Sequence, residues 1–468
     1  MKLRQFFKSK EFKIFLTVWL VYVFYFSDIG GAYADSAAAL TVSIVDYHTL
    51  SIDAYKNHSN AHNFAYYKGK FYSGVAPGTS FLAAPIYAIF KSLTRISYRF
   101  GYSPPIVNLV AAVALSAIFL SAVASALTAV LLFKLLEHFT KNKKKRLFLT
   151  FVFSFGTLFF IYSTQYEPVV IATFFSFSSF YLLFKVKHKE MGYNALFLAG
   201  FLCAAAISMH YLQIVIFAAL SIYFLSFSMN LKKLFLYGSG ALIPIVLLMS
   251  YHYYVFDSPF KTGYHYLYNV HLIKSLPSDY ATKLVFPTSN SIFGLSFSPF
   301  RGIFFYMPIT LLSLYGIYWN FRRNSKYISD IFFCCFIFIS SFLFISALGD
   351  WWGGCSFGPR YLMPVLPFIF VIIGSAIDYL KVAFAYILGL LSVFINYLPI
   401  IYGRECRTYN DILNVYIPSI MKEGFSRYLP LTMLSKYLIK IPPYAIGLFH
   451  ILGLFILGFF MYLLWKKN

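Results

Sequence analysis

The first apolar stretch of the sequence is followed by four aspartates, Asp28, Asp35, Asp46 and Asp53. A carboxylate beside a membrane is costly to keep unless it has a function. A carboxylate held where a membrane span ends could remove the proton from a hydroxyl group that arrives from outside. Alternatively, these acids are solvated loop residues, or one of them caps the helical stretch that begins at Ser36. Composition alone favours the second interpretation.

A second cluster, DWWGGCSFGPRYLMPVLP, lies between two apolar runs at residues 350–367. Trp351 and Trp352 offer flat faces on which a sugar ring can stack, and Arg360 offers a planar fork that fits two phosphate oxygens. An interfacial tryptophan pair followed by a glycine-rich turn would have the same composition. We favour a binding site, because Asp350, both tryptophans, three glycines and Arg360 fall within eleven residues.

Two further segments offer cations. YYKGKFYSGVAPGTSFLAAP, residues 66–85, combines aromatic residues and lysines with a run of Gly, Pro and Thr that predicts a tight turn before a helix. Tyr72 could stack on a sugar and Lys70 could steady a phosphate, although an aromatic belt at the membrane interface has the same composition. Arg301, in GLSFSPFRG, stands at the mouth of a later apolar run.

The elements that position these residues follow from composition. Of the 468 residues, 60% are hydrophobic, 22% are aromatic and only 12% are charged, against about 25% charged in an ordinary soluble domain. No soluble fold of this size hides so much apolar surface, and spans through lipid must be helical because unpaired backbone groups are too costly there. We therefore predict an all-α polytopic membrane protein.

About twelve membrane spans are predicted from the lengths of the apolar runs. They cover residues 13–27, 104–133, 147–163, 168–185, 193–209, 211–229, 233–255, 302–320, 329–347, 364–380, 382–402 and 443–465. Clusters of Lys and Arg fall at every second boundary, so the positive-inside rule puts both termini in the cytoplasm. Most Asp and Glu residues then lie outside, where chemistry that needs a carboxylate is expected. The net charge of +23 does not indicate nucleic-acid binding, because the basic residues form short clusters between apolar runs.

Three predicted outer loops, 28–103, 256–301 and 403–442, are too long to be simple connectors. The first contains an amphipathic piece, roughly 80–100, with Lys91, Arg95 and Arg99 at helical spacing. We expect a helix that lies in the membrane interface. Its cations either face lipid head groups or merely anchor it by snorkelling.

The amino-terminal residues 1–34 have the layout of a secretory signal, with a basic start, an apolar stretch and the sequence Ala32-Tyr33-Ala34. The apolar stretch is rich in Trp, Tyr and Phe. We therefore interpret it as an uncleaved first span.

The five cysteines have no metal-type spacing, and no clear set of metal ligands is present. Cys203, Cys334 and Cys335 fall inside apolar runs and are expected to be small core residues. Cys355 and Cys406 would share the outer side, where they could form a disulfide. We predict no metal and no other cofactor.

Three of these segments carry a family resemblance. YYKGKFYSGVAPGTSFL, FSPFRGIFFYMP and DWWGGCSFGPRYLMPVLP resemble a bacterial branch of the GT-C glycosyltransferases. That superfamily includes protein O-mannosyltransferases and lipid A aminoarabinose transferases. The resemblance runs from the first-loop aspartates to the span after Pro364. It implies a polyprenyl-phosphate sugar donor, an extracytoplasmic active site in the bacterial inner membrane, and inversion at the sugar carbon.

The resemblance also implies roles for particular residues. The catalytic base corresponds to Asp35, although many relatives have an Asp-Glu pair where this chain has Asp35-Ser36. Positive charge is needed where the leaving phosphate gains negative charge, and the candidates for it are Arg360, Arg301 and Lys70. The residues expected to bind the rest of the substrate are Asp53, Tyr72, Tyr264, Asp350, Trp351, Trp352 and Tyr361.

The expected organisation is a catalytic transmembrane module, residues 1–402, followed by an outer loop and a last span, 403–468. The expected partners are the lipid-linked donor, a glycan, lipid or protein acceptor, and membrane lipids, with no nucleic acid. Two alternatives remain. One is an oligosaccharide polymerase or ligase that uses a diphosphate-linked donor. The other is a polytopic transporter of lipids or solutes, which would explain the spans but not the large outer loops rich in acids and tryptophans.

Overall fold

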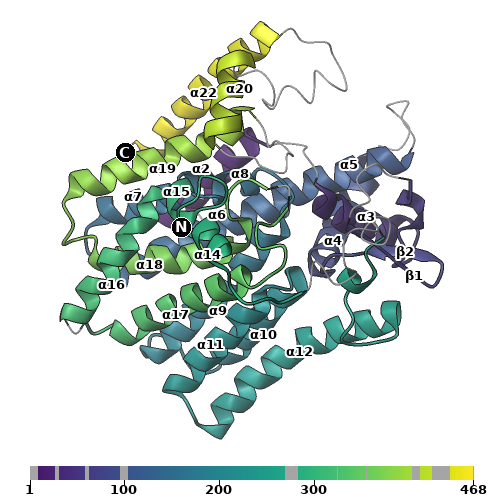
Figure 1. The fold of residues 1–468 in the computed structure, drawn as a ribbon, viewed down its shortest axis with the longest axis horizontal. Coiled ribbons are helices and arrows are strands. Elements are labelled where there is room, and N and C mark those ends of the chain that lie inside the picture. Colours follow the sequence, from purple (N-terminus) through teal and green to yellow (C-terminus); the bar gives the residue numbers. More distant parts are fainter. Residues whose placement is uncertain are drawn as a thin grey trace, which may run out of the picture.

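The structure is a computed structural model. It describes residues 9–26, 31–57, 63–94, 104–268, 283–323, 325–354, 356–402, 412–423 and 443–466. Most of this part of the chain is helical, and the helices form one bundle with a small cap at one end (Figure 1).

The helices of the bundle follow the predicted spans. They are α2 (Lys10–Phe24), α5 (Pro104–Ser116), α6 (Ala122–Leu135), α7 (Lys143–Phe155), α8 (Phe159–Ser163), α9 (Pro168–Lys187), α10 (Ala195–Met209), α11 (Gln213–Phe227), α12 (Leu231–Phe256), α15 (Ile303–Tyr306), α16 (Leu312–Arg323), α17 (Ile328–Ser346), α18 (Leu366–Ala376), α19 (Val382–Tyr402) and α22 (Pro443–Trp465). A π-turn, η4 (Ala117–Ser121), joins α5 to α6, and 3-10 turns precede α16 (η7, Pro308–Leu311) and α18 (η8, Arg360–Val365).

Five helical segments of the described chain are long and apolar enough to cross a membrane: Val107–His138, Pro168–Lys187, Leu231–Phe256, Ile328–Ser346 and Val382–Ile401. The chain is therefore a polytopic helical membrane protein. Each predicted span falls on one helix or on consecutive helices. The number of crossings, about twelve, stays a prediction, because several of these helices are shorter than the roughly 20 residues a bilayer requires.

Segments that the charge pattern predicts to be cytoplasmic meet at one end of the bundle. Buried Asp330, at the start of α17, accepts hydrogen bonds from Lys187 (2.8 Å) and contacts His188 (3.0 Å) at the end of α9. Lys145 of α7 contacts Asp378 beyond α18 (3.1 Å). The predicted outer segments meet at the opposite end, where the cap lies.

The cap contains α3 (Ala32–Asp46), η1 (Asp53–Tyr55), a hairpin of β1 (Phe64–Tyr67) and β2 (Lys70–Ser73), and α4 (Gly78–Thr94). The strands pair antiparallel with Tyr67 opposite Lys70. Lys68 and Gly69 both have positive φ, which suits the two-residue turn of a right-twisted hairpin. The all-α prediction omitted these strands, because the argument against strands applies only to segments inside lipid.

Asp46 fastens the cap helices α3 and α4 to α5 of the bundle. Its buried carboxylate accepts hydrogen bonds from Tyr87 (3.1 Å) and Lys91 (2.5 Å) of α4 and from Asn108 of α5 (2.8 Å). The predicted helix at 80–100 is present as α4, but Lys91 is bound to Asp46 instead of facing lipid head groups. Arg95 and Arg99 lie outside the described residues.

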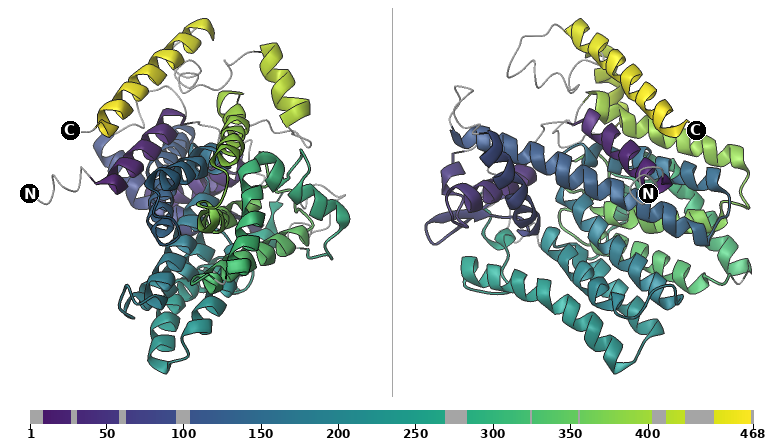
Figure 2. Two further views of the ribbon diagram at one scale, coloured as in Figure 1. Left: turned by 90° about the vertical axis from the view of Figure 1, so that its left-hand side faces the viewer. Right: turned by 180° about the vertical axis from the view of Figure 1, so that it is seen from behind.

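Helix α12 packs along α10 at the side of the bundle. Gly200 and Gly240 face each other's helix so closely that an added Cβ would come within 2.0 Å of a carbonyl oxygen. This close packing fixes α12, which leads into the loop carrying Tyr264. At another edge, α22 lies against α2, where Trp465 donates to Thr17 (3.0 Å; Figure 2).

The cysteine predictions are settled in part. Cys203, Cys334 and Cys335 are free and buried, which confirms that they are core residues. Cys355 and Cys406 lie outside the described residues, so the pairing between them stays a prediction.

Candidate active site

Arg360 lies at the centre of a buried polar cluster at the cap end of the bundle. It begins η8, directly after a loop in which Gly353, Gly354 and Gly358 have positive φ, a conformation that favours glycine. The tight loop brings the carbonyl oxygen of Gly353 within 3.2 Å of Arg360 Nη2. The glycines therefore let the loop fold back over the side chain of Arg360.

Glu167 is the acid that faces Arg360. Its Oε2 lies 3.5 Å from Arg360 Nη1, and both side chains are largely buried. Glu167 precedes Pro168 at the start of α9, and its backbone N–H donates to Ser121 of η4 (3.0 Å). Sequence analysis missed this residue, because an acid before a proline at a helix start is common for local reasons.

Several side chains around this pair carry a buried polar atom without a hydrogen-bond partner in the described structure. They are Tyr33 (Oη), Glu167 (Oε1), His210 (Nδ1), Gln213 (Oε1 and Nε2), Asp350 (Oδ1) and Arg360 (Nε). More than nine in ten buried polar groups in proteins are hydrogen-bonded. A concentration of exceptions in one place indicates a polar ligand, since each unpaired group costs about 1–3 kcal/mol.

Burial sets the protonation of two members of the cluster. It raises the pKa of Asp350 to about 6, against the opposing effect of Arg360. It lowers the pKa of His210 to about 3, and the charge of Arg360 acts in the same direction. His210 is therefore neutral at pH 7. Arg360 is the cation of this cluster with an unpaired N–H, among groups that accept or share hydrogen bonds.

Arg301 is fully buried and holds the loop 350–358 in place. Its guanidinium donates to the carbonyl oxygens of Trp352 (2.9 Å), Gly354 (3.0 Å) and Phe300 (2.8 Å). Trp351 packs edge-on against Trp352 and covers Gly294, where an added Cβ would lie 2.3 Å from the indole. These contacts give Arg301 and Trp351 a part in shaping the loop. Their predicted roles in substrate binding stay predictions.

Helix α3 borders the cluster through Tyr33, whose ring stacks on His210 with the centroids 5.9 Å apart. His210 in turn faces Tyr361 (6.3 Å). Asp35 lies in the same first turn of α3 and is buried. Residues two apart differ by roughly 200° around a helix, so Asp35 points to a different face from Tyr33.

The other predicted site residues divide between the cluster and the hairpin. Tyr264 lies close enough to Arg360, Asp350 and Glu167 for their charges to act on the pKa of its hydroxyl group, so it belongs to the cluster. The carboxylate of Asp53 stabilises the local fold of the cap. It accepts hydrogen bonds from the hydroxyl of Ser51 (2.5 Å) and from the backbone N–H of Phe71 (2.7 Å).

The remaining two predictions fall on strand β2. Lys70 is exposed next to the hairpin turn. Tyr72 packs edge-on against Phe256, with the ring centroids 6.0 Å apart. These contacts place both residues in the cap, and none of them joins either residue to Arg360.

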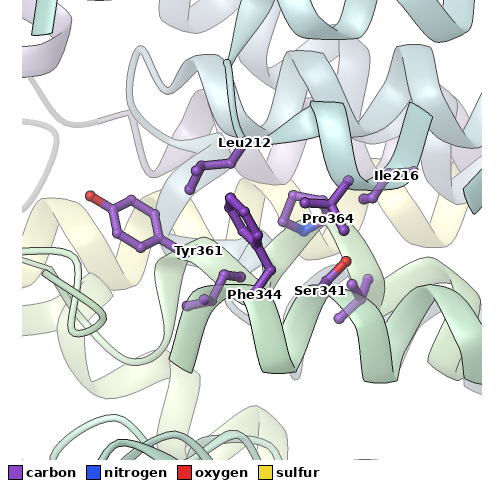
Figure 3. Close-up of a pocket in the computed structure, with 9 residues that line it drawn as sticks. Leu212, Ile216, Ser341, Phe344, Tyr361 and Pro364 are labelled. Atoms are coloured by element: carbon purple, nitrogen blue, oxygen red, sulfur yellow. The ribbon is translucent and has the colours of Figure 1, made fainter. Parts of the chain in front are cut away.

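An apolar crevice adjoins the cluster. It lies between α11, α17 and η8 and is lined by residues that include Leu212, Ile216, Phe344 and Pro364, with Tyr361 at one end (Figure 3). Figure 3 shows the hydroxyl of Tyr361 directed away from the crevice. A polar centre therefore borders a small apolar crevice between helices.

The described residues contain no group of three or more His, Cys, Asp or Glu side chains arranged to hold a metal ion. The absence of a cofactor stays a prediction.

Neither the known protein families nor the curated protein sequences contain a match to this chain. Among solved structures, the chain is similar to the crystal structure of ArnT from Cupriavidus metallidurans bound to undecaprenyl phosphate. The TM-score is 0.52 at 14% sequence identity, over 97% of this chain and 76% of ArnT. The chain has the fold of ArnT. ArnT is a GT-C lipid A aminoarabinose transferase, so the expected GT-C resemblance is confirmed at the level of the fold.

Proposed function

We propose that this protein transfers a sugar from a polyprenyl-phosphate donor to an acceptor hydroxyl group at the outer face of the bacterial inner membrane. The observation that carries the proposal is the set of unpaired buried polar atoms around Arg360, next to an apolar crevice. The unpaired polar atoms fit the polar head of such a donor, and the apolar crevice at Tyr361 marks the side on which its tail would leave. ArnT, which shares the fold, was solved with such a lipid.

Arg360 binds the donor phosphate in this proposal. Its Nε is unpaired, while Nη1 and Nη2 face Glu167 and Gly353. Glu167 keeps the guanidinium in place, and its free Oε1 can accept a hydrogen bond from a sugar hydroxyl. In this proposal the isoprenoid tail leaves the site on the side of α11 and α17, whose apolar crevice is too narrow in this structure to hold it. Charge-assisted contacts of this kind are about twice as strong as neutral hydrogen bonds.

Transfer needs a base and a leaving group. The acceptor oxygen attacks the anomeric carbon while the bond from that carbon to the phosphate oxygen breaks, and the configuration inverts. Asp35 takes the proton of the acceptor hydroxyl. The electron pair of the broken bond leaves on the lipid phosphate, which Arg360 stabilises. Tyr33 and Asp35 share the first turn of α3, so the base lies on the element that borders the donor site.

Two alternatives differ in ways that can be measured. A ligase with a diphosphate-linked donor would bind a lipid diphosphate more tightly than undecaprenyl phosphate. A transporter would move its substrate without breaking a bond. The unpaired N–H of Arg360 can bind one phosphate group, which favours a monophosphate.

Asp35→Asn tests the base. It keeps the shape of the side chain but removes its basicity, so sugar transfer should fall by about 10² or more while undecaprenyl phosphate still binds. Turnover of lipid-linked sugars in membranes that contain the protein can be followed by mass spectrometry, and lipid binding by native mass spectrometry. Asp257→Asn is the control, because Asp257 is an exposed acid of the cap that pairs with Lys68. Full transfer by Asp35→Asn would move the base to another acid.

A further inference from the structure

An uncharged segment lies beside the active-site loop. Residues 284–297, LVFPTSNSIFGLSF, contain no acid and no base. Their large side chains are exposed, with Phe286 at 94%, Phe293 at 58% and Phe297 at 54%. Soluble surfaces rarely present so many neighbouring apolar side chains. This segment belongs to a predicted outer loop, where an aqueous surface would be expected.

Backbone contacts fix the depth of the segment in the membrane. The N–H of Val285 donates to the carbonyl of Ala347 at the end of α17 (2.7 Å), and the N–H of Gly349 donates to Lys283 (3.0 Å). Helix α17 is long and apolar enough to span the membrane, and Leu343 in its last turn is exposed. The segment is therefore level with the lipid-facing end of α17. Figure 1 places α14 between the hairpin and the opposite end of the bundle, well away from the tip of the cap.

The segment is an ordered element with two faces. Helix α14 (Ser289–Ser296) is started by a capping box in which Thr288 and Ser291 exchange hydrogen bonds. Its buried side includes Gly294 and Leu295, and Gly294 lies directly under Trp351. Ile292 and Phe293 are on the exposed side. Helix α14 therefore packs against the loop of Asp350 with one side and exposes its apolar side chains on the other.

We propose that residues 284–297 form a wedge that inserts into the outer leaflet of the bilayer, with the acyl chains of membrane lipids as its partner. The wedge itself carries no charge and joins the end of α17, and exposed Lys283 immediately precedes it. Its interior face supports Trp351, so one wall of the active site is seated on lipid. This inference concerns where α14 sits and does not require the proposed transfer reaction.

A soluble partner fits the segment less well. A glycan needs hydrogen-bond donors and acceptors. Exposed Ser289 and Asn290 offer these at the start of α14, but Ile292 and Phe293 expose only hydrocarbon. A second protein would need a surface that reaches to the depth of the last turn of α17, where exposed Leu343 is expected to face lipid. Lipid is the occupant that the position provides.

Single cysteines that carry an environment-sensitive fluorophore test the wedge in lipid nanodiscs. The test position is Phe293→Cys, which changes an exposed side chain and leaves the buried face of α14 intact. Leu343→Cys on α17 is the control for a lipid-facing site, and Tyr66→Cys on the hairpin is the control for an aqueous site, since Tyr66 is 44% exposed there. The unsubstituted chain, treated in the same way, gives the background from native cysteines.

We expect the label at position 293 to behave like the label at position 343. Its emission should shift to the blue, nitroxide-labelled phospholipids should quench it several-fold more than they quench position 66, and aqueous iodide should have little effect. The same pattern is expected from Phe286→Cys, which gives an independent second position. Iodide quenching at positions 293 and 286 equal to that at position 66 would overturn the proposal.

Discussion

Arg360 and Glu167 form a buried pair whose purpose can be tested by removing both charges. If Arg360 serves only to neutralise Glu167, the double variant Glu167→Gln with Arg360→Gln leaves no charge unpaired and should regain stability and function together. If Arg360 binds the donor phosphate, stability should recover while binding of undecaprenyl phosphate stays about 10-fold or more weaker, as expected from the loss of a charged hydrogen bond.

Thermal unfolding in detergent and lipid binding by native mass spectrometry separate the two outcomes. Each single variant should be less stable than the double variant, because it leaves one buried charge without its partner. Arg360→Lys gives a further comparison, since it keeps the charge but not the planar fork. Wild-type lipid affinity in the double variant would show that Arg360 is structural.

At the scale of elements, the position of α3 depends on Asp46. This side chain accepts hydrogen bonds from α4 and α5 and is 6% exposed. Asp46→Ala would leave Tyr87 and Asn108 without their acceptor, at a cost of about 2 kcal/mol. We expect a lower unfolding temperature and slower transfer, because α3 also carries Asp35 three turns earlier.

Asp46→Asn should lose less stability than Asp46→Ala, since the amide oxygen can still accept one of these bonds. Asp257→Asn on the exposed hairpin contact is the control and should change the unfolding temperature little, because asparagine tolerates the positive φ of this position. Unfolding can be followed by intrinsic fluorescence in detergent. An Asp46→Ala protein as stable as the Asp257→Asn protein would contradict the role given to Asp46.

For the whole molecule, the charge pattern predicts that the cap faces away from the cytoplasm. Lys70→Cys on the hairpin and Lys144→Cys at the start of α7 place exposed thiols at the two ends of the bundle. A membrane-impermeant maleimide should label position 70 in cells with a permeabilised outer membrane, and position 144 only after the inner membrane is broken. The opposite result would invert the topology and put the candidate active site in the cytoplasm.

The sequence by itself determined the class of the molecule. The composition and the lengths of the apolar stretches depend on many residues at once, so a single unusual position does not change them. Together they correctly predicted a polytopic helical protein. Short motifs predicted that Arg360 and Asp350 would lie together, because both belong to one compact glycine-rich loop. The family resemblance predicted the fold that the ArnT structure confirms.

Tertiary structure alone decided which distant residues share the site. Glu167 and Arg360 are nearly 200 positions apart in the sequence, and no local pattern distinguishes this glutamate from an ordinary acid at a helix start. The sequence pattern indicated that Arg301 would be available to bind phosphate. In the structure its guanidinium donates hydrogen bonds to three backbone carbonyl oxygens. The physical reason is that the burial of a polar group and its hydrogen bonds depend on which residues pack against it. In a helical bundle, those neighbouring residues come from helices far apart along the chain.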